Sequence, residues 1–170
     1  MRAGIASLRG ARVFRAVRAA VALASDDDFR VLEFSVQSDH VHLVVEAERT
    51  SALRAGIQGL AIRIARAVNR ALGRRGRMWA DRYHARLLRT PREVRHALVY
   101  VLGNWRKHVR DARGLDPCSS ARWFTGWRRL ARSKVDVPPT APPRTWLARV
   151  GWRRHGLIDV DEGPRPRRRR

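Results

Sequence analysis

The sequence contains one cysteine, two lysines and no long apolar run. A lone Cys118 excludes an intramolecular disulfide framework and a cysteine-rich zinc site. No segment approaches the roughly 20 apolar residues of a membrane span. The basic N-terminus before Ala19–Ala24 resembles an export signal, but Arg15 and Arg18 interrupt that stretch. We therefore expect no membrane association and a cytoplasmic location, with an arginine-rich transit peptide as an open alternative.

Acidic residues are also scarce. The chain of 170 residues has 15 Asp and Glu against 37 Lys and Arg, which gives a net charge of +22 at pH 7. Lys107 and Lys134 are the only lysines, so arginine carries nearly all of this charge. Guanidinium groups match phosphate geometry, so a nucleic acid is the expected partner. The alternative is that a GC-rich genome encodes arginine everywhere. The hydrophobic fraction of 44% excludes wholesale disorder.

The apolar periodicity and turn signals predict alternating helices and strands. They predict an amphipathic helix from Val13 to Leu23, strands at Phe29–Val36, His40–Glu46 and Tyr83–Leu88, a long helix after Thr50 or Ser51, and a helix from Pro91 to about His108. This order is most of a ferredoxin-like α+β sandwich. Only Met1–Leu8 precedes the first helix, so we expect the usual opening strand to be missing or shortened.

The composition changes after residue 110. We expect a catalytic domain over 1–110, followed by an extension over 111–133 that Trp123, Phe124 and Trp127 anchor. The remaining segments are a proline-rich linker (134–145), a short C-terminal helix (146–162) and a basic disordered tail (163–170).

His40-Val41-His42 is the most specific chemical pattern. Residues two apart on a strand point to the same face, so both imidazoles project together. Two convergent imidazoles are two potential metal ligands. The alternative is an incidental pair on the solvated face of an edge strand.

A second pattern lies on the helix after Thr90-Pro91, where His96, Tyr100, Asn104 and His108 recur every four residues. Tyr100 and Asn104 share a face of that helix. A tyrosine hydroxyl can attack a phosphodiester and hold the product covalently. The alternative is a tyrosine at the edge of the core beside a capping amide.

Three segments together resemble the single-tyrosine HUH transposases, an IS200-like family, particularly their REP-associated tyrosine transposase branch. These segments are Phe34–Glu46 (FSVQSDHVHLVVE), Arg77–Leu88 (RMWADRYHARLL) and His96–His108 (HALVYVLGNWRKH). The resemblance implies a ferredoxin-like fold and a bacterial, nucleoid-associated monomer or homodimer that acts on single-stranded or hairpin DNA. It also implies a bound Mg²⁺ or Mn²⁺ and a 5′-phosphotyrosine intermediate.

The same resemblance assigns roles to individual residues. His40 and His42 match the metal-binding histidines, and Tyr100 matches the nucleophile. Asn104 stands where the family has a polar third ligand, often glutamine, which is one methylene longer. Tyr83 is a competing nucleophile that matches no family role.

Basic residues near these motifs are candidates for DNA contacts, since arginine and lysine bind phosphates. Trp79 is a candidate to stack a base, with core packing as its alternative role. The full set of DNA-binding candidates is Arg74, Arg75, Arg77, Trp79, Arg82, Arg86, Arg106 and Lys107.

Three functions fit the sequence. The first is a DNA endonuclease and strand transferase that acts at hairpin-associated sites. The second is a domesticated or decayed descendant that binds hairpin nucleic acid without cutting it. A missing opening strand favours either decay or a misplaced start codon, whereas intact His40, His42 and Tyr100 favour activity. The third is a basic RNA-binding protein, which explains the charge but not the pairing of the histidine and tyrosine motifs.

Overall fold

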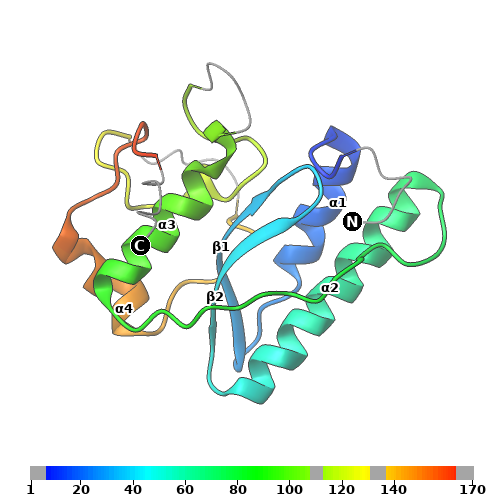
Figure 1. The fold of residues 1–170 in the computed structure, drawn as a ribbon, viewed down its shortest axis with the longest axis horizontal. Helices are drawn as coiled ribbons and strands as arrows, with labels where there is room; N and C mark the ends of the chain where they lie inside the picture. The colour runs from blue at the N-terminus through cyan, green and yellow to red at the C-terminus, as the bar shows by residue number, and fades with distance from the viewer. Residues whose placement is uncertain (1–6, 108–112, 131–136, 164–170) are drawn as a thin grey trace, which may run out of the picture.

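The computed structural model describes residues 7–107, 113–130 and 137–163 (Figure 1). Its regular elements, in chain order, are α1 (Ala11–Ala22), β1 (Phe29–Val36), β2 (Val41–Ala47), α2 (Thr50–Leu72), α3 (Pro91–Gly103), the 3₁₀ helices η1 (Asn104–Lys107) and η2 (Ala121–Trp123), α4 (Trp146–Arg149) and the 3₁₀ helix η3 (Gly151–His155). None of the described helices is long and apolar enough to cross a membrane.

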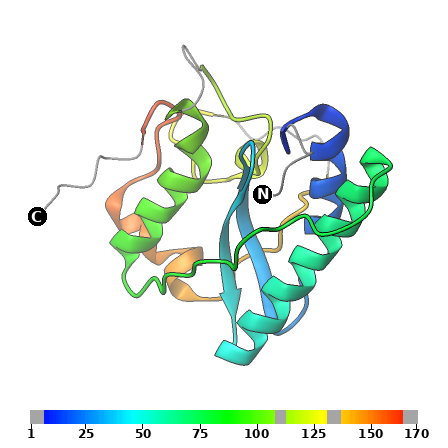
Figure 2. The same cartoon turned by 45° about the vertical axis from the view of Figure 1, so that its right-hand side comes forward.

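The β1–β2 hairpin separates two layers of helices (Figures 1 and 2). On one face, α1 and α2 form a core with side chains such as Val17, Phe34 and Ile64. On the other face, α3 and the C-terminal elements form a second core, which includes Leu98 and Trp152. This mixed α+β arrangement confirms the expected fold class and is compatible with a reduced ferredoxin-like sandwich.

The two strands pair in the antiparallel register that the sequence predicts. Ser35 lies opposite His42, and Phe34 lies opposite Leu43. The register shifts between Val31 and Glu33, so β1 carries a bulge. Leu32 and Phe34 are two residues apart and would share a face of a regular strand, but across the bulge Leu32 joins the core on the α3 side and Phe34 the core on the α1 side.

The strand predicted at Tyr83–Leu88 is wrong. These residues lie in the long connection between α2 and α3 without regular secondary structure, and Tyr83 to Leu87 are exposed (Figure 1). Their β-prone side chains have no sheet face to cover. Arg86 instead pairs with Glu93, a residue of the capping box that begins α3 at Thr90.

The extension after residue 110 covers the outer edge of β1. Ser119 forms an antiparallel bridge with Ser35, and the backbone N–H of Val36 donates to the carbonyl of Cys118 at 2.8 Å. Further along the same edge, the N–H of Ala141 donates to Val31. A segment of the expected linker is therefore hydrogen-bonded to the hairpin, which satisfies an otherwise open strand edge.

A buried carboxylate holds this extension in place. Asp116 is 2% exposed and forms an ion pair with Arg9 at 2.7 Å. It also accepts hydrogen bonds from the Ser35 hydroxyl and the Cys118 backbone. Because each partner lies on a different segment, Asp116 joins the N-terminal region, β1 and the extension.

The single helix predicted after Trp146 is instead two short pieces. The chain leaves helical geometry at Val150, and η3 follows at Gly151. Gly151 packs so closely on the Trp146 ring that a Cβ there would lie 2.7 Å from a ring carbon. Trp152 is buried in the core on the α3 side, so tertiary packing overrides the longer helix. The expected basic tail lies outside the described residues apart from Gly163.

Candidate active site

The two motif histidines meet at the start of β2. His40 immediately precedes the strand, and His42 is on the face that also carries the buried Val44 of the α3-side core. Their rings meet edge to face with centroids 4.5 Å apart, and their Nε2 atoms are 3.0 Å apart. The alternation of the strand therefore brings both imidazoles to one point, as the sequence predicts.

Tyr100 and Asn104 approach the same point from the helical layer. α3 packs Val94, Leu98 and Leu102 into the core, while Tyr100 remains 39% exposed. The Tyr100 and His42 rings have centroids 5.0 Å apart at an interplanar angle of 71°. The helix expected to run to about His108 ends at Gly103, and Asn104 begins the 3₁₀ helix η1. Its amide nitrogen lies 3.2 Å from Nε2 of His42.

Asp39 is a site residue that the sequence analysis treated only as part of a turn. Its carboxylate accepts a hydrogen bond from Nδ1 of His40 at 2.7 Å. This contact lowers the pKa of the Asp39 carboxyl below its ordinary value. A carboxylate on Nδ1 fixes the tautomer in which the Nε2 lone pair is available. In the sequence, only the position of Asp39 next to His40 could have indicated this contact.

The three side chains suit a small divalent cation. Two Nε2 atoms 3.0 Å apart need a hydrogen or a cation between them, and Asn104 adds an amide at 3.2 Å from one of them. Neighbouring ligands around an octahedral ion with bonds of ~2.1 Å are separated by about 3 Å. A flip of the Asn104 amide presents its oxygen instead of its nitrogen. Among the described residues no three His, Cys, Asp or Glu side chains form a metal cluster. The side chains that come together here are two imidazoles and one amide.

The basic loop after α2 carries three of the candidate DNA contacts. Gly73 ends α2 with φ 63°, a left-handed conformation that favours glycine, and Gly76 has φ 95°. Between and after them, Arg75 and Arg77 are exposed. Arg74 is half-buried, and its Nη1 has no hydrogen-bond partner within the part of the chain that the structure describes.

The other candidate contacts have different environments. Trp79 packs against the core and donates its indole N–H to the carbonyl of Ala61 at 2.9 Å, which agrees with the alternative packing role. Arg82 is exposed, and Arg86 is paired with Glu93. The last two candidates, Arg106 and Lys107, belong to η1, which follows α3. The structure describes only the backbone of Lys107, whereas the side chain of Arg106 is largely buried.

The Arg106 guanidinium makes intramolecular contacts. It donates to the carbonyl oxygens of Val160 and Gly114 and lies 3.5 Å from the carboxylate of Asp161. These contacts connect the end of α3 to the extension and to the C-terminal segment. We therefore infer a structural role for Arg106, and the exposed loop arginines remain better placed for an external phosphate.

The competing tyrosine has a different setting from Tyr100. Tyr83 is 48% exposed and lies in the irregular connection, with no helix or strand to fix its direction. Of the remaining predicted positions, His108 lies outside the described residues.

Comparison with known proteins identifies the family of the chain. The family model for IS200-like transposases matches residues 11–101, which include both histidines and Tyr100. Asn104 lies just beyond the matched stretch. Comparisons with curated proteins and with solved structures give no match. The match covers more than half of the sequence. The chain therefore belongs to the IS200-like transposase family, whose members process DNA for transposition.

Proposed function

We propose that this transposase cuts and rejoins single-stranded DNA through a covalent bond to Tyr100, next to a divalent ion held by His40, His42 and Asn104. The observation that carries the proposal is the convergence of three groups beside the Tyr100 ring: the Nε2 atoms of His40 and His42 are 3.0 Å apart, and the Asn104 amide lies 3.2 Å from Nε2 of His42. This set combines a metal site with a partly exposed nucleophile. A packing role alone would not require paired nitrogen atoms at that distance.

The cleavage step transfers one phosphoryl group. The phenolic oxygen of Tyr100 attacks phosphorus, and the bond from phosphorus to the 3′ oxygen of the preceding nucleotide breaks. The phenolic proton leaves, and the departing oxygen gains a proton to become a 3′-OH. The 5′ phosphate remains attached to Tyr100, so one phosphodiester replaces another and rejoining needs no external energy source.

Mg²⁺ or Mn²⁺, when bound, polarises the phosphate and offsets its developing charge. The residues of this chain orient the metal ligands and the nucleophile. Asp39 orients His40, the alternation of β2 orients His42, and α3 directs Tyr100 toward the same point. The exposed loop arginines, Arg75 and Arg77, are suited to hold the DNA backbone by its phosphates.

Hairpin DNA is the substrate we propose, with single-stranded DNA beside the stem as the cut segment. The test is to incubate the full chain with a labelled hairpin oligonucleotide and Mn²⁺, with a chelator control. We expect a metal-dependent band of covalent protein–DNA adduct on a denaturing gel. A protein that binds the hairpin tightly and never forms the adduct would instead be the decayed, non-catalytic form.

A further inference from the structure

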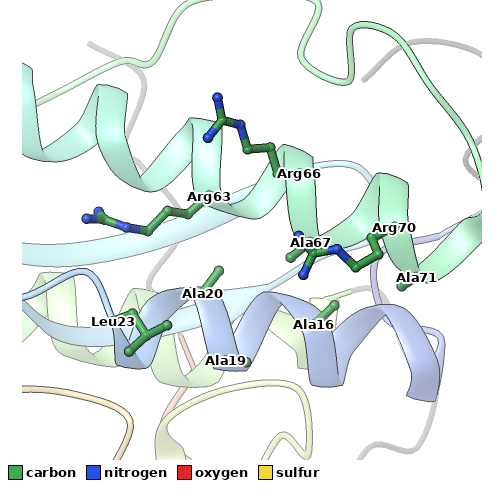
Figure 3. A pocket seen from close by; sticks show the side chains of 9 residues that line it. All are labelled: Ala16, Ala19, Ala20, Leu23, Arg63, Arg66, Ala67, Arg70 and Ala71. Carbon is green, nitrogen blue, oxygen red and sulfur yellow. The ribbon is translucent and has the colours of Figure 1, made fainter.

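A groove of about 500 Å³ runs between α1 and α2, on the layer away from the candidate active site (Figure 3). The α1 side of the groove consists of small or apolar side chains, including Ala16, Ala19 and Leu23. Leu23 is 73% exposed and adds an apolar side chain to this wall. This wall offers a surface for apolar contact and has no side-chain hydrogen-bond donor.

The α2 side of the groove is cationic. Arg63, Arg66 and Arg70 follow one another at intervals of three and four residues, so they share one side of the helix. In Figure 3, Arg63 and Arg70 extend along the gap between the helices, whereas Arg66 is directed away from α1. The groove thus has one apolar wall and one positively charged wall.

The positive charge of this layer is not balanced locally. Neither α1 nor α2 contains an aspartate or a glutamate. Within residues 7–107, 113–130 and 137–163, no carboxylate forms an ion pair with Arg63, Arg66 or Arg70. An occupant with carboxylates on one flank would therefore meet guanidinium groups that are available to pair.

We propose that this groove binds an acidic amphipathic helix of a partner protein. The apolar face of such a helix fits the wall that Ala16, Ala19 and Leu23 form, and its acidic flank fits Arg63 and Arg70. Recognition of an amphipathic helix in a groove depends on anchors that recur every three or four residues. Arg63 and Arg70 are seven residues apart, which is two such repeats, so a parallel or antiparallel helix can pair with both guanidinium groups.

A nucleic acid fits this groove less well. The residues that line it include no aromatic side chain on which a base could stack. A phosphate backbone would use only the arginines, and it would leave the apolar α1 wall and Leu23 without a complementary surface. An amphipathic helix uses both walls.

The helices α1 and α2, which line the groove, lie on one side of the hairpin, and α3, which carries Tyr100, lies on the other (Figure 2). The side chains of β2 that face α1 and α2, such as Leu43, alternate with those that face α3, such as Val44. A partner bound between α1 and α2 therefore leaves the His42 side of the sheet open. A partner in this groove would recruit the transposase and would not take part in DNA cleavage.

The test uses the full chain and a fluorescent synthetic peptide. The peptide is a helix of about five turns, with leucines every three or four residues and glutamates along one flank. A control peptide has serine in place of each leucine. We expect the first peptide to bind, and Arg63→Glu to weaken binding about tenfold, the effect of losing a charge pair. Leu23→Ser should also weaken binding, whereas the control peptide should not bind.

Arg54→Glu is the matched charge control, because Arg54 is an exposed residue of α2 that does not line the groove. An equal loss of affinity with Arg54→Glu and Arg63→Glu would overturn the proposal, since it would indicate unspecific attraction. Failure of the acidic peptide to bind would also overturn it. Single-stranded DNA that displaces the peptide, or self-association of the chain that Leu23→Ser abolishes, would assign the groove to another occupant.

Discussion

The ring of Tyr100 lies edge-on to the ring of His42, with their centroids 5.0 Å apart. One residue belongs to a helix and the other to a strand, and the helix packs on the sheet through its neighbouring apolar residues. The contact brings the candidate nucleophile beside the candidate metal ligands. Packing of α3 on the hairpin therefore sets the position of the candidate nucleophile relative to the candidate metal ligands.

Binding to single-stranded DNA should weaken steeply as salt increases. Each phosphate that an arginine neutralises releases counterions and adds about −0.7 to the slope of log K against log salt concentration. Arg75→Gln should reduce the magnitude of that slope by about one contact, whereas Arg49→Gln should change it less, because Arg49 already pairs with Asp28. Fluorescence anisotropy across a salt series measures the slope. A flat response would reject the electrostatic DNA contact.

Replacement of a metal-site histidine should abolish cleavage. We expect His42→Ala to lose at least about a hundredfold in rate, since it removes a direct ligand, while DNA binding through the arginines persists. Asn104→Ala should have a smaller effect because water can fill a vacant position around Mg²⁺. His155→Ala is the control, since His155 is an exposed residue of η3. Full cleavage by His42→Ala in the presence of a chelator would refute the metal assignment.

Asp39 should act on the metal through His40. We expect Asp39→Ala to weaken Mn²⁺ binding by about tenfold, as is typical when the partner of a metal-bound histidine is lost. Asp39→Asn should keep most of the affinity, since its amide oxygen still accepts from Nδ1. Electron paramagnetic resonance of Mn²⁺ titrated into DNA-free protein gives the affinity. If Asp39→Ala matched the exposed-site control Asp81→Ala, Asp39 would have no positioning role.

Glu33 should make the protein less stable as pH rises. Desolvation raises the pKa of the Glu33 carboxyl from 4.5 to about 8, against the effect of its hydrogen bond from Ser120. Below pH 4.5 both folded and unfolded states hold the proton. Between pH 4.5 and about 8 only the folded state holds it, so the free energy of unfolding falls with rising pH.

Glu33→Gln removes that ionisation and should stabilise the protein by about 2–3 kcal/mol at pH 7, with little change at pH 4. Urea denaturation at both pH values measures the difference. The exposed Glu48→Gln should change stability little at either pH. Equal stabilities of Glu33→Gln and the unmodified chain at pH 7 would contradict a protonated Glu33.

Local signals in the sequence were sufficient for the hairpin and for the start of α3. Alternating apolar residues and a polar turn predict β1 and β2, and the two-residue spacing of His40 and His42 at the start of β2 predicts that their imidazoles converge. The Thr90-Pro91 pair predicts the beginning of α3, where the structure has a capping box. These features depend on residues close in sequence, so local physics determines them.

The extension after residue 110 is held to β1 by contacts between residues that are far apart in the sequence. Asp116 stabilises the edge of β1 through Arg9 and Ser35, and no spacing rule connects these three positions. The helix that the sequence predicted to continue to about His108 changes to the 3₁₀ helix η1 at Asn104. Tyr83 and its neighbours have strand-like composition but no partner strand in the described chain. Tertiary contacts decide whether such segments form strands or helices, and the apolar periodicity of the sequence carries no information about those contacts.

The most direct measurement is the position of the covalent bond to DNA. Tyr100→Phe keeps the ring and its contact with His42 and removes only the oxygen that attacks phosphorus. The unmodified chain and Tyr83→Phe should both form an adduct with hairpin DNA in Mn²⁺, and peptide mass mapping should place the phosphotyrosine at residue 100. Tyr100→Phe should fold, bind the hairpin and form no adduct. An adduct that persists in Tyr100→Phe, or a phosphotyrosine mapped to residue 83, would contradict the assignment.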